Sequence, residues 1–223
     1  MTKVADHQEL DETRKKLIEA AGEVFAEVGF NDATVREICS RAGTNIAAVN
    51  YHFRDKLSLY TEVLRSSMMA QAGAALNSSA PYPSDPKAGL KILIYEWFER
   101  TREGGRPSWL GRIMAHEMAH PTPALDYVAE AMAPNYLHFR KLVGKIIGRG
   151  PDDKRTRMCV HSVVGQVLQY MQSRPMLERL WPDLDLDDEK QRRTIADHIV
   201  EFSLAGMETA AQQKTRLSKQ KQE

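Results

Sequence analysis

Apolar side chains recur along this chain at the three- and four-residue spacing of helices, and they show no strand-like alternation. The first periodic segment runs from Asp11 to Val28. Its apolar side consists of Leu17, Ala21, Val24, Phe25 and Val28. Gly29 follows directly, as glycine commonly does at the end of a helix. The pattern therefore predicts a helix over residues 11–28.

The next two predicted helices are short, and Gly43 lies in the turn between them. Thr34 can cap the first helix, and Glu37 can reach back to complete a capping box. Asn45 can cap the second, which is predicted from Ile46 to about Phe53. Two short helices joined by a glycine-containing turn match the helix-turn-helix, whose second helix lies in the major groove of DNA.

The remaining segments are also helical in pattern, with loops where serine, proline and glycine gather. Further helices are predicted over about 55–76, 90–98, 109–120, 124–147 with a bend at Pro134, 152–171 and 188–211. The fold class is therefore all-α with about nine helices. We expect an N-terminal three-helix domain with the helix-turn-helix over residues 1–54. A long helix then joins it to a C-terminal helical bundle within residues 55–223.

Charge restricts how such a protein could hold DNA. The formal net charge is +1, and the first 60 residues contain eight lysines and arginines against ten acidic residues. A sequence-blind polyanion binder usually has a basic domain, so this balance counts against that class. DNA binding must depend on a few well-placed phosphate contacts.

Two further features bear on the cell compartment. The two cysteines, Cys39 and Cys159, are far apart and have no metal-finger spacing, which suggests a reducing setting. No signal-peptide pattern and no run of 18 apolar residues is present. We expect a cytoplasmic protein with no membrane partner.

Several motifs together resemble the DNA-binding domain of the TetR family of transcriptional regulators, over about residues 11–65. They are Gly29-Phe30, the segment ATVREICSRAG, and the segment NYHFRDKLSLYTEVL. The triplet Tyr51-His52-Phe53, followed by Asp55-Lys56-Leu57, is characteristic of that family. The later segment HEMAHPTPALDYV, with the bent helix after it, is similar to the subgroup with a CecR-like C-terminal domain.

The resemblance implies a ligand-responsive regulator without enzymatic activity or cofactor, and we expect a repressor. It implies a homodimer on a palindromic double-stranded operator, released by a small-molecule effector. Phosphate contacts carried over from the family are Thr34, Tyr51, His52 and Lys56. The predicted base-reading face comprises Asn45, Ala47, Ala48 and Asn50, and Thr44 completes the predicted DNA contacts. Ile46 and Asn50 replace the family's common lysine and tyrosine, so relatives do not predict the operator sequence.

The C-terminal half contains two sets of candidates. Large or adaptable residues could line an effector cavity, although each could equally be ordinary core: Trp97, Trp109, Met114, Met118, His161, Gln166 and Tyr170. Family equivalents of two helices pair across a dimer interface, although the same residues could simply close the core of one chain: Val160, Val163, Val164, Val167, Met171, Ile195, Ile199 and Phe202.

Two other functions compete with this reading. The run from His116 to His120 satisfies H-E-x-x-H, the zinc-hydrolase motif, with Glu130 as a possible third ligand. Pro121 ends the helix at once and the extended metzincin pattern is missing, so we expect no metal and no catalysis there. A helix end beside the effector cavity is the simpler interpretation. A scaffold protein with a vestigial helix-turn-helix is the second rival, and the retained Thr34, Tyr51, His52 and Lys56 argue against it.

Overall fold

The computed structural model describes residues 2–77, 83–100, 102–103, 106–107 and 109–219. Within these ranges the chain forms ten helices and one short pair of strands, so the all-α class is confirmed. The helices are α1 (Thr2–Asp32), α2 (Val35–Ala42), α3 (Ile46–Phe53), α4 (Lys56–Asn77), α5 (Pro86–Arg100), α6 (Trp109–Ala119), α7 (Ala124–Ile147), α8 (Lys154–Gln172), α9 (Arg174–Leu180) and α10 (Glu189–Lys219). The strands are β1 (Arg102–Glu103) and β2 (Arg106–Pro107), which pair with each other.

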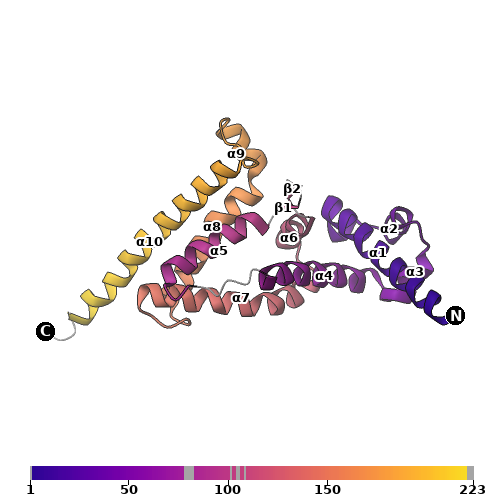
Figure 1. Cartoon of the computed structure of the whole chain (residues 1–223), viewed down its shortest axis with the longest axis horizontal. Helices are drawn as coiled ribbons and strands as arrows, with labels where there is room; N and C mark the ends of the chain where they lie inside the picture. The colour runs from indigo at the N-terminus through magenta and orange to yellow at the C-terminus, as the bar shows by residue number, and fades with distance from the viewer. Residues whose placement is uncertain (1, 78–82, 101, 104–105, 108, 220–223) are drawn as a thin grey trace. The chain divides into compact units, whose positions relative to one another are not determined.

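The helices are divided between two compact units (Figure 1). The first unit contains α1 to α4, α6, and α7 as far as Met132. The second contains α5, α7 from Ala133 onward, and α8 to α10. Packing thus places α4 and α6 with the helix-turn-helix. Since a compact unit is defined by packing and not by function, the functional boundary at residue 54 stays a prediction.

Aromatic rings at the centre of the first unit join α1 to α4. The ring centroid of Tyr60 lies 4.8 Å from that of Phe25 and 5.0 Å from that of Phe30. Tyr60 and Phe25 are fully buried, as are Leu17, Ile38 and Val49 from the three N-terminal helices. Burial of rings and aliphatic side chains is the main favourable term in folding. The core of this unit therefore holds the two short helices in place.

Helix α6 packs closely on α1 because two glycines lie in the contact. A Cβ at Gly22 would come within 3.0 Å of the Trp109 ring. A Cβ at Gly29 would come within 3.1 Å of Nδ1 of His116. Gly29 also has φ 76° and ψ 175°, a backbone conformation available almost only to glycine, and it ends the regular part of α1.

The second unit is built on α10, against which both α5 and α8 pack (Figure 1). Its buried core combines aliphatic residues of four helices, among them Ile94, Val143, Val163 and Ile199. No described helix has both the length and the apolar character needed to cross a membrane.

Three helices differ most from the sequence prediction. Helix α1 begins at Thr2 and α10 extends to Lys219, so both are longer than predicted. Helix α9 lies between the helices predicted over 152–171 and 188–211, in a stretch that contains Pro175 and Pro182 and where no helix was expected. Pro175 is in its first turn, where the missing N–H costs nothing, so this proline is compatible with a helix start.

Candidate nucleic-acid interface

Three residues, Thr34, Glu37 and Gly43, account for where α2 begins and ends. The Thr34 hydroxyl accepts a hydrogen bond from the Glu37 backbone N–H at 3.2 Å. Gly43 takes up a left-handed conformation (φ 64°) and ends the helix. The predicted capping box forms only in part, because the Glu37 carboxylate accepts a hydrogen bond from Arg41, 2.8 Å away. Arg41 is also bonded to Glu27 of α1, so the guanidinium ties α2 to α1.

Helix α3 has one buried and one exposed face. Val49 and Phe53 are buried in the core of the first unit. The Asn45 side chain caps the helix by accepting a hydrogen bond from the Ala48 N–H at 3.1 Å. The exposed face consists of Asn45, Ile46, Ala47, Asn50 and Tyr51. Short capped helices are otherwise marginal, so the face depends on this core for its position.

The predicted base readers are not equivalent in the structure. Ala47 and Asn50 are exposed, with no competing role. Ala48 is half-buried and packs against the core. Asn45 is exposed, but its side-chain oxygen is engaged in the cap.

The exposed face also includes a residue that the sequence analysis did not select. Ile46 is 51% exposed at the first position of α3, and an apolar side chain there can contact a thymine methyl group. Its position directly after the capping residue Asn45 was the feature of the sequence that could have identified it.

The predicted phosphate contacts are mixed in exposure. Thr34 is exposed at the start of α2, whereas Thr44 and His52 are half-buried. Tyr51 is 70% exposed, and its ring meets the His52 ring edge-on at a centroid distance of 4.9 Å. A tyrosine in this position could instead serve mainly to pack the short helices together, but a side chain so exposed contributes little packing.

Lys56 has a structural role that the sequence did not reveal. Its ammonium donates hydrogen bonds to the carbonyl oxygens of Phe30 and Ala33 at 2.8 and 2.9 Å. It also lies 4.4 Å from the centroid of the Phe30 ring, a cation–π distance. Lys56 thereby fastens the start of α4 to the end of α1, and its phosphate contact stays a prediction.

The connection from α3 to α4 is a tight turn at Arg54. The Asp55 N–H donates to the Phe53 carbonyl oxygen at 2.9 Å, and Arg54 has φ 70° and ψ −50°. This is a γ-turn of the rare, strained form. Asp55 caps α4 by accepting from the Ser58 N–H at 2.7 Å, and this bond lowers the pKa of the Asp55 carboxyl.

Two parts of the chain match known protein families. Residues 17–63 match the family model of bacterial regulatory proteins of the tetR family. Residues 86–207 match the C-terminal domain of the HTH-type transcriptional dual regulator CecR. The chain belongs to the TetR family and has a CecR-type C-terminal domain. It is a DNA-binding transcriptional regulator.

Individual relatives agree with this assignment. The HTH-type transcriptional dual regulator CecR of Shigella flexneri is 27% identical over 204 residues, which are 85% of this chain and 90% of that protein. AcrR of the same organism is 29% identical over 110 residues, 49% of this chain and 51% of that protein. The matched relatives are transcriptional regulators and not enzymes.

Solved structures share the fold of this TetR-family chain. The fatty acid degradation regulator FadR from Bacillus halodurans aligns with a TM-score of 0.65 at 18% identity, covering 87% of this chain and 95% of that one. FadR from Bacillus subtilis in complex with stearoyl-CoA aligns with a TM-score of 0.66 at 16% identity, covering 86% and 98%. At such identities the likeness shows the fold alone.

The H-E-x-x-H residues of this TetR-family protein surround a small pocket of about 240 Å³ in the first unit. Glu117 is only 1% exposed, and its carboxylate accepts hydrogen bonds from the Tyr60 hydroxyl at 2.8 Å and the Thr122 N–H at 2.7 Å. Burial and the bond to Glu117 raise the pKa of the Tyr60 hydroxyl. The glutamate therefore joins α4, α6 and the start of α7. Within the described ranges, no three His, Cys, Asp or Glu side chains gather as a metal site.

The predicted effector-cavity residues are split between the two units. Trp109, Met114 and Met118 are on α6, whereas Trp97, His161, Gln166 and Tyr170 belong to the second unit. Trp109 and Met114 pack against the first core, and Trp97 and Tyr170 against the second. His161 is bonded to Tyr136 at 3.1 Å and Gln166 to Ser203 at 3.2 Å. Packing against the two cores accounts for four of these seven side chains. Contact of any of the seven with a ligand stays a prediction.

The predicted dimer-interface residues fall into a buried group and a more exposed group. Val160, Val163, Val167, Ile195 and Ile199 are at most 5% exposed in the core of a single chain. Side chains buried in their own chain have no surface to offer a partner, so these five close the core. Val164 and Met171 are half-buried, and Phe202 is 63% exposed. The interface prediction therefore rests on these three.

Proposed function

We propose that this regulator acts as a homodimer that inserts α3 of each subunit into successive major grooves of a palindromic operator. The exposed face of α3, with Asn50 and Tyr51 on a helix fixed by a buried core, is the observation that carries the proposal. Asparagine can bond adenine through two hydrogen bonds, and Ala47 and Ile46 can meet thymine methyl groups. The two helices must lie about 34–36 Å apart to reach successive grooves.

Phosphate contacts come from residues around this face. Thr34 and Tyr51 expose hydroxyl groups, and Arg36 is an exposed cation on α2. Among the described residues, no carboxylate lies within ion-pair distance of Arg36, whereas Arg41 is paired with Glu27 and Glu37. Arg36 is therefore a phosphate contact that we add to the predicted set. Few free cations suffice when each is positioned by the fold.

We further propose that a small-molecule effector releases the operator and that DNA binding represses transcription. FadR of Bacillus subtilis was solved with stearoyl-CoA, and an acyl thioester is one candidate effector class. The effector acts by population shift, since it must prefer the conformation whose recognition helices are wrongly spaced. A ligand with equal affinity for both conformations would change nothing.

Selection of bound sequences from a random DNA pool, followed by gel shifts at several salt concentrations, tests the proposal. We expect Tyr51→Phe to weaken binding to all sequences, because it removes a phosphate contact. Asn50→Ala should change the preferred base at one position of each half-site, by about 1–3 kcal/mol per base pair. Lys56 is a poor test, since its replacement also disturbs the fold.

Asn135→Ala is the matched control, because Asn135 is exposed on α7 and belongs to the second unit, whereas α3 belongs to the first. It should leave affinity and preferred sequence unchanged. If the purified protein selects no sequence, or if Asn50→Ala selects the same sequence as the parent, the proposed use of α3 is wrong.

A further inference from the structure

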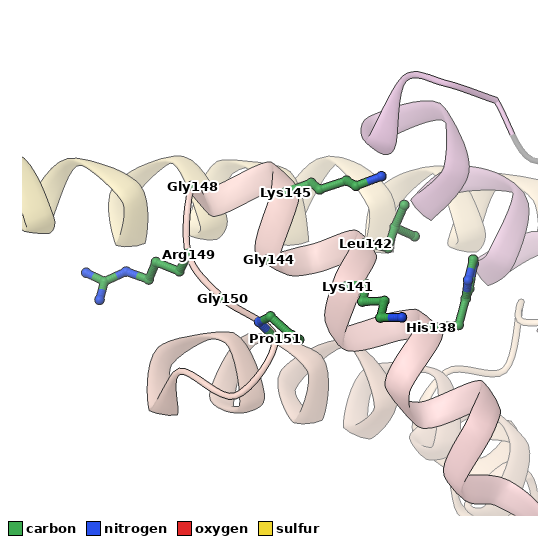
Figure 2. A pocket seen from close by; sticks show the side chains of 9 residues that line it. All are labelled: His138, Lys141, Leu142, Gly144, Lys145, Gly148, Arg149, Gly150 and Pro151. Atoms are coloured by element: carbon green, nitrogen blue, oxygen red, sulfur yellow. The ribbon is translucent and has the colours of Figure 1, made fainter.

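The second unit contains a cationic groove along the C-terminal half of α7. Its volume is about 580 Å³, within the range of small-molecule sites. His138, Lys141 and Lys145 line it from one face of the helix, and the turn from Gly148 to Pro151 closes its end (Figure 2). Residues three, four and seven apart share a helix face, so these three side chains border the same space.

The end of the groove is shaped by a close backbone contact. The Arg149 N–H donates to the Gly144 carbonyl oxygen at 2.9 Å, so the chain after α7 folds back on the helix. A Cβ at Gly144 would lie 2.7 Å from the Arg149 carbonyl oxygen, which leaves room for glycine only. The turn and the glycine together make a fixed wall.

Two lysines of the groove have charges that the described part of the chain does not neutralise. No carboxylate of the described residues lies within ion-pair distance of Lys141 or Lys145. By contrast, Lys87 and Lys91 of the same unit are paired with Glu208 and Asp197, each at 2.9 Å. Two lysines one helical turn apart repel each other and destabilise a helix. An unpaired pair of this kind is unfavourable unless something else binds it.

The acidic residues nearest in sequence are already engaged. Asp152 accepts hydrogen bonds from Arg140 and Arg157 at 2.5 and 3.2 Å. Asp153 is paired with Arg149 at 3.2 Å and caps α8. The Arg149 side chain points away from Lys141 and Lys145 (Figure 2). The two lysines are therefore the charges left to meet a ligand.

We propose that this groove binds a small molecule with adjacent phosphate groups, such as a nucleoside diphosphate, with the ammonium groups of Lys141 and Lys145 on the phosphates. Lysine binds phosphate as a point charge, and charge-assisted hydrogen bonds are about twice as strong as neutral ones. Leu142 and Pro151 add apolar surface for the organic part of the ligand. The negative end of the α7 dipole opposes an anion here, which the two full charges outweigh.

Calorimetric titration of the full-length protein with ADP, inorganic pyrophosphate, adenosine and citrate, at fixed ionic strength, tests this site. We expect ADP and pyrophosphate to bind, adenosine to fail, and citrate to bind more weakly. The double variant Lys141→Gln/Lys145→Gln should weaken ADP binding by roughly tenfold or more, because the charge-assisted bonds are lost. Both side chains are exposed, so the variant should fold normally.

The matched control is Lys154→Gln/Lys190→Gln, which removes the same charge from exposed lysines of the same unit outside the groove. It should bind ADP like the parent. Equal weakening in both double variants, absence of ADP binding, or equal binding of citrate would each overturn the proposal. Gel shifts with the selected operator separate this result from the proposed DNA binding, since Lys141→Gln/Lys145→Gln should still bind DNA in the absence of nucleotide.

Discussion

At the scale of single residues, two side chains do more than their sequence positions suggest. Lys56 was predicted to hold a phosphate, and its ammonium is bonded to the carbonyl groups that end α1. Arg54 adopts a conformation that costs about 1–3 kcal/mol in a residue with a side chain. Both lie in the connection that orients α3, so the fold places backbone strain and a cationic clamp beside the proposed DNA contacts.

We predict that Arg54→Gly raises the free energy of unfolding by about 1 kcal/mol. Removal of the Cβ relieves the strained turn, and this gain exceeds the entropic cost of a glycine, about 0.5–1 kcal/mol. Urea unfolding followed by circular dichroism measures the change. Arg54→Ala is the matched control, since it removes the charge but keeps the Cβ, and no gain is expected. A gain of equal size in both variants would show that the guanidinium, and not the backbone, is the cause.

At the scale of elements, the helices of the first unit are joined by a buried polar contact. The Glu117 carboxylate of α6 accepts bonds from Tyr60 of α4 and from Thr122, just before α7. A buried carboxylate is tolerated only when its oxygens are satisfied, and here they are. The same glutamate that resembled a catalytic base in the sequence is thus a structural link between helices.

We predict that Tyr60→Phe lowers the free energy of unfolding by about 1.5 kcal/mol, because a buried charged acceptor loses one of its donors. Thermal and urea unfolding measure the effect. Tyr127→Phe is the control, because Tyr127 is half-buried on α7 and should tolerate the loss of its hydroxyl. An unchanged stability in Tyr60→Phe, or zinc retained by the parent protein in stoichiometric amount and lost in His116→Ala/His120→Ala, would contradict the structural role.

At the scale of the whole molecule, dimer formation has to use surface that a single chain leaves exposed. Five of the eight predicted interface side chains are buried in their own core. Phe202 of α10 remains, with Val164 and Met171 partly available. Gly165 and Gly206 have no atom within 4 Å of a Cβ position, so the backbones of α8 and α10 are accessible to a partner helix.

We predict that Phe202→Asp shifts the protein from dimer to monomer, since a charge would be buried in a hydrophobic contact. Light scattering after size-exclusion chromatography measures the mass, and operator affinity should fall with it. Met132→Asp, at a similarly exposed apolar residue of α7, should remain dimeric. If Phe202→Asp stays dimeric, the interface lies elsewhere on the molecule.

Much of the fold was determined locally and was therefore predictable from the sequence. Thr34, Gly43 and Asn45 end or begin helices through bonds to their own neighbours, so the helix-turn-helix was recognisable without tertiary information. Periodicity likewise identified the apolar side of the first helix, of which Leu17, Ala21, Val24 and Phe25 are fully buried. Helix α9 was missed because Pro175 was read as a breaker, whereas a first-turn proline is compatible with a helix.

Nine of the ten described helices, the family and most of the exposed face of α3 could be predicted from the sequence, because these depend on local bonds and on spacing along one chain. Which charged side chains are paired and which are left unpaired depends on the folded arrangement of the helices. Lys56 is bonded to Ala33, 23 positions away, and Glu117 to Tyr60, 57 positions away. Lys141 and Lys145, by contrast, have no acidic partner among the described residues. Such long-range pairing is set by how helices pack, and a linear pattern of residue types does not specify it.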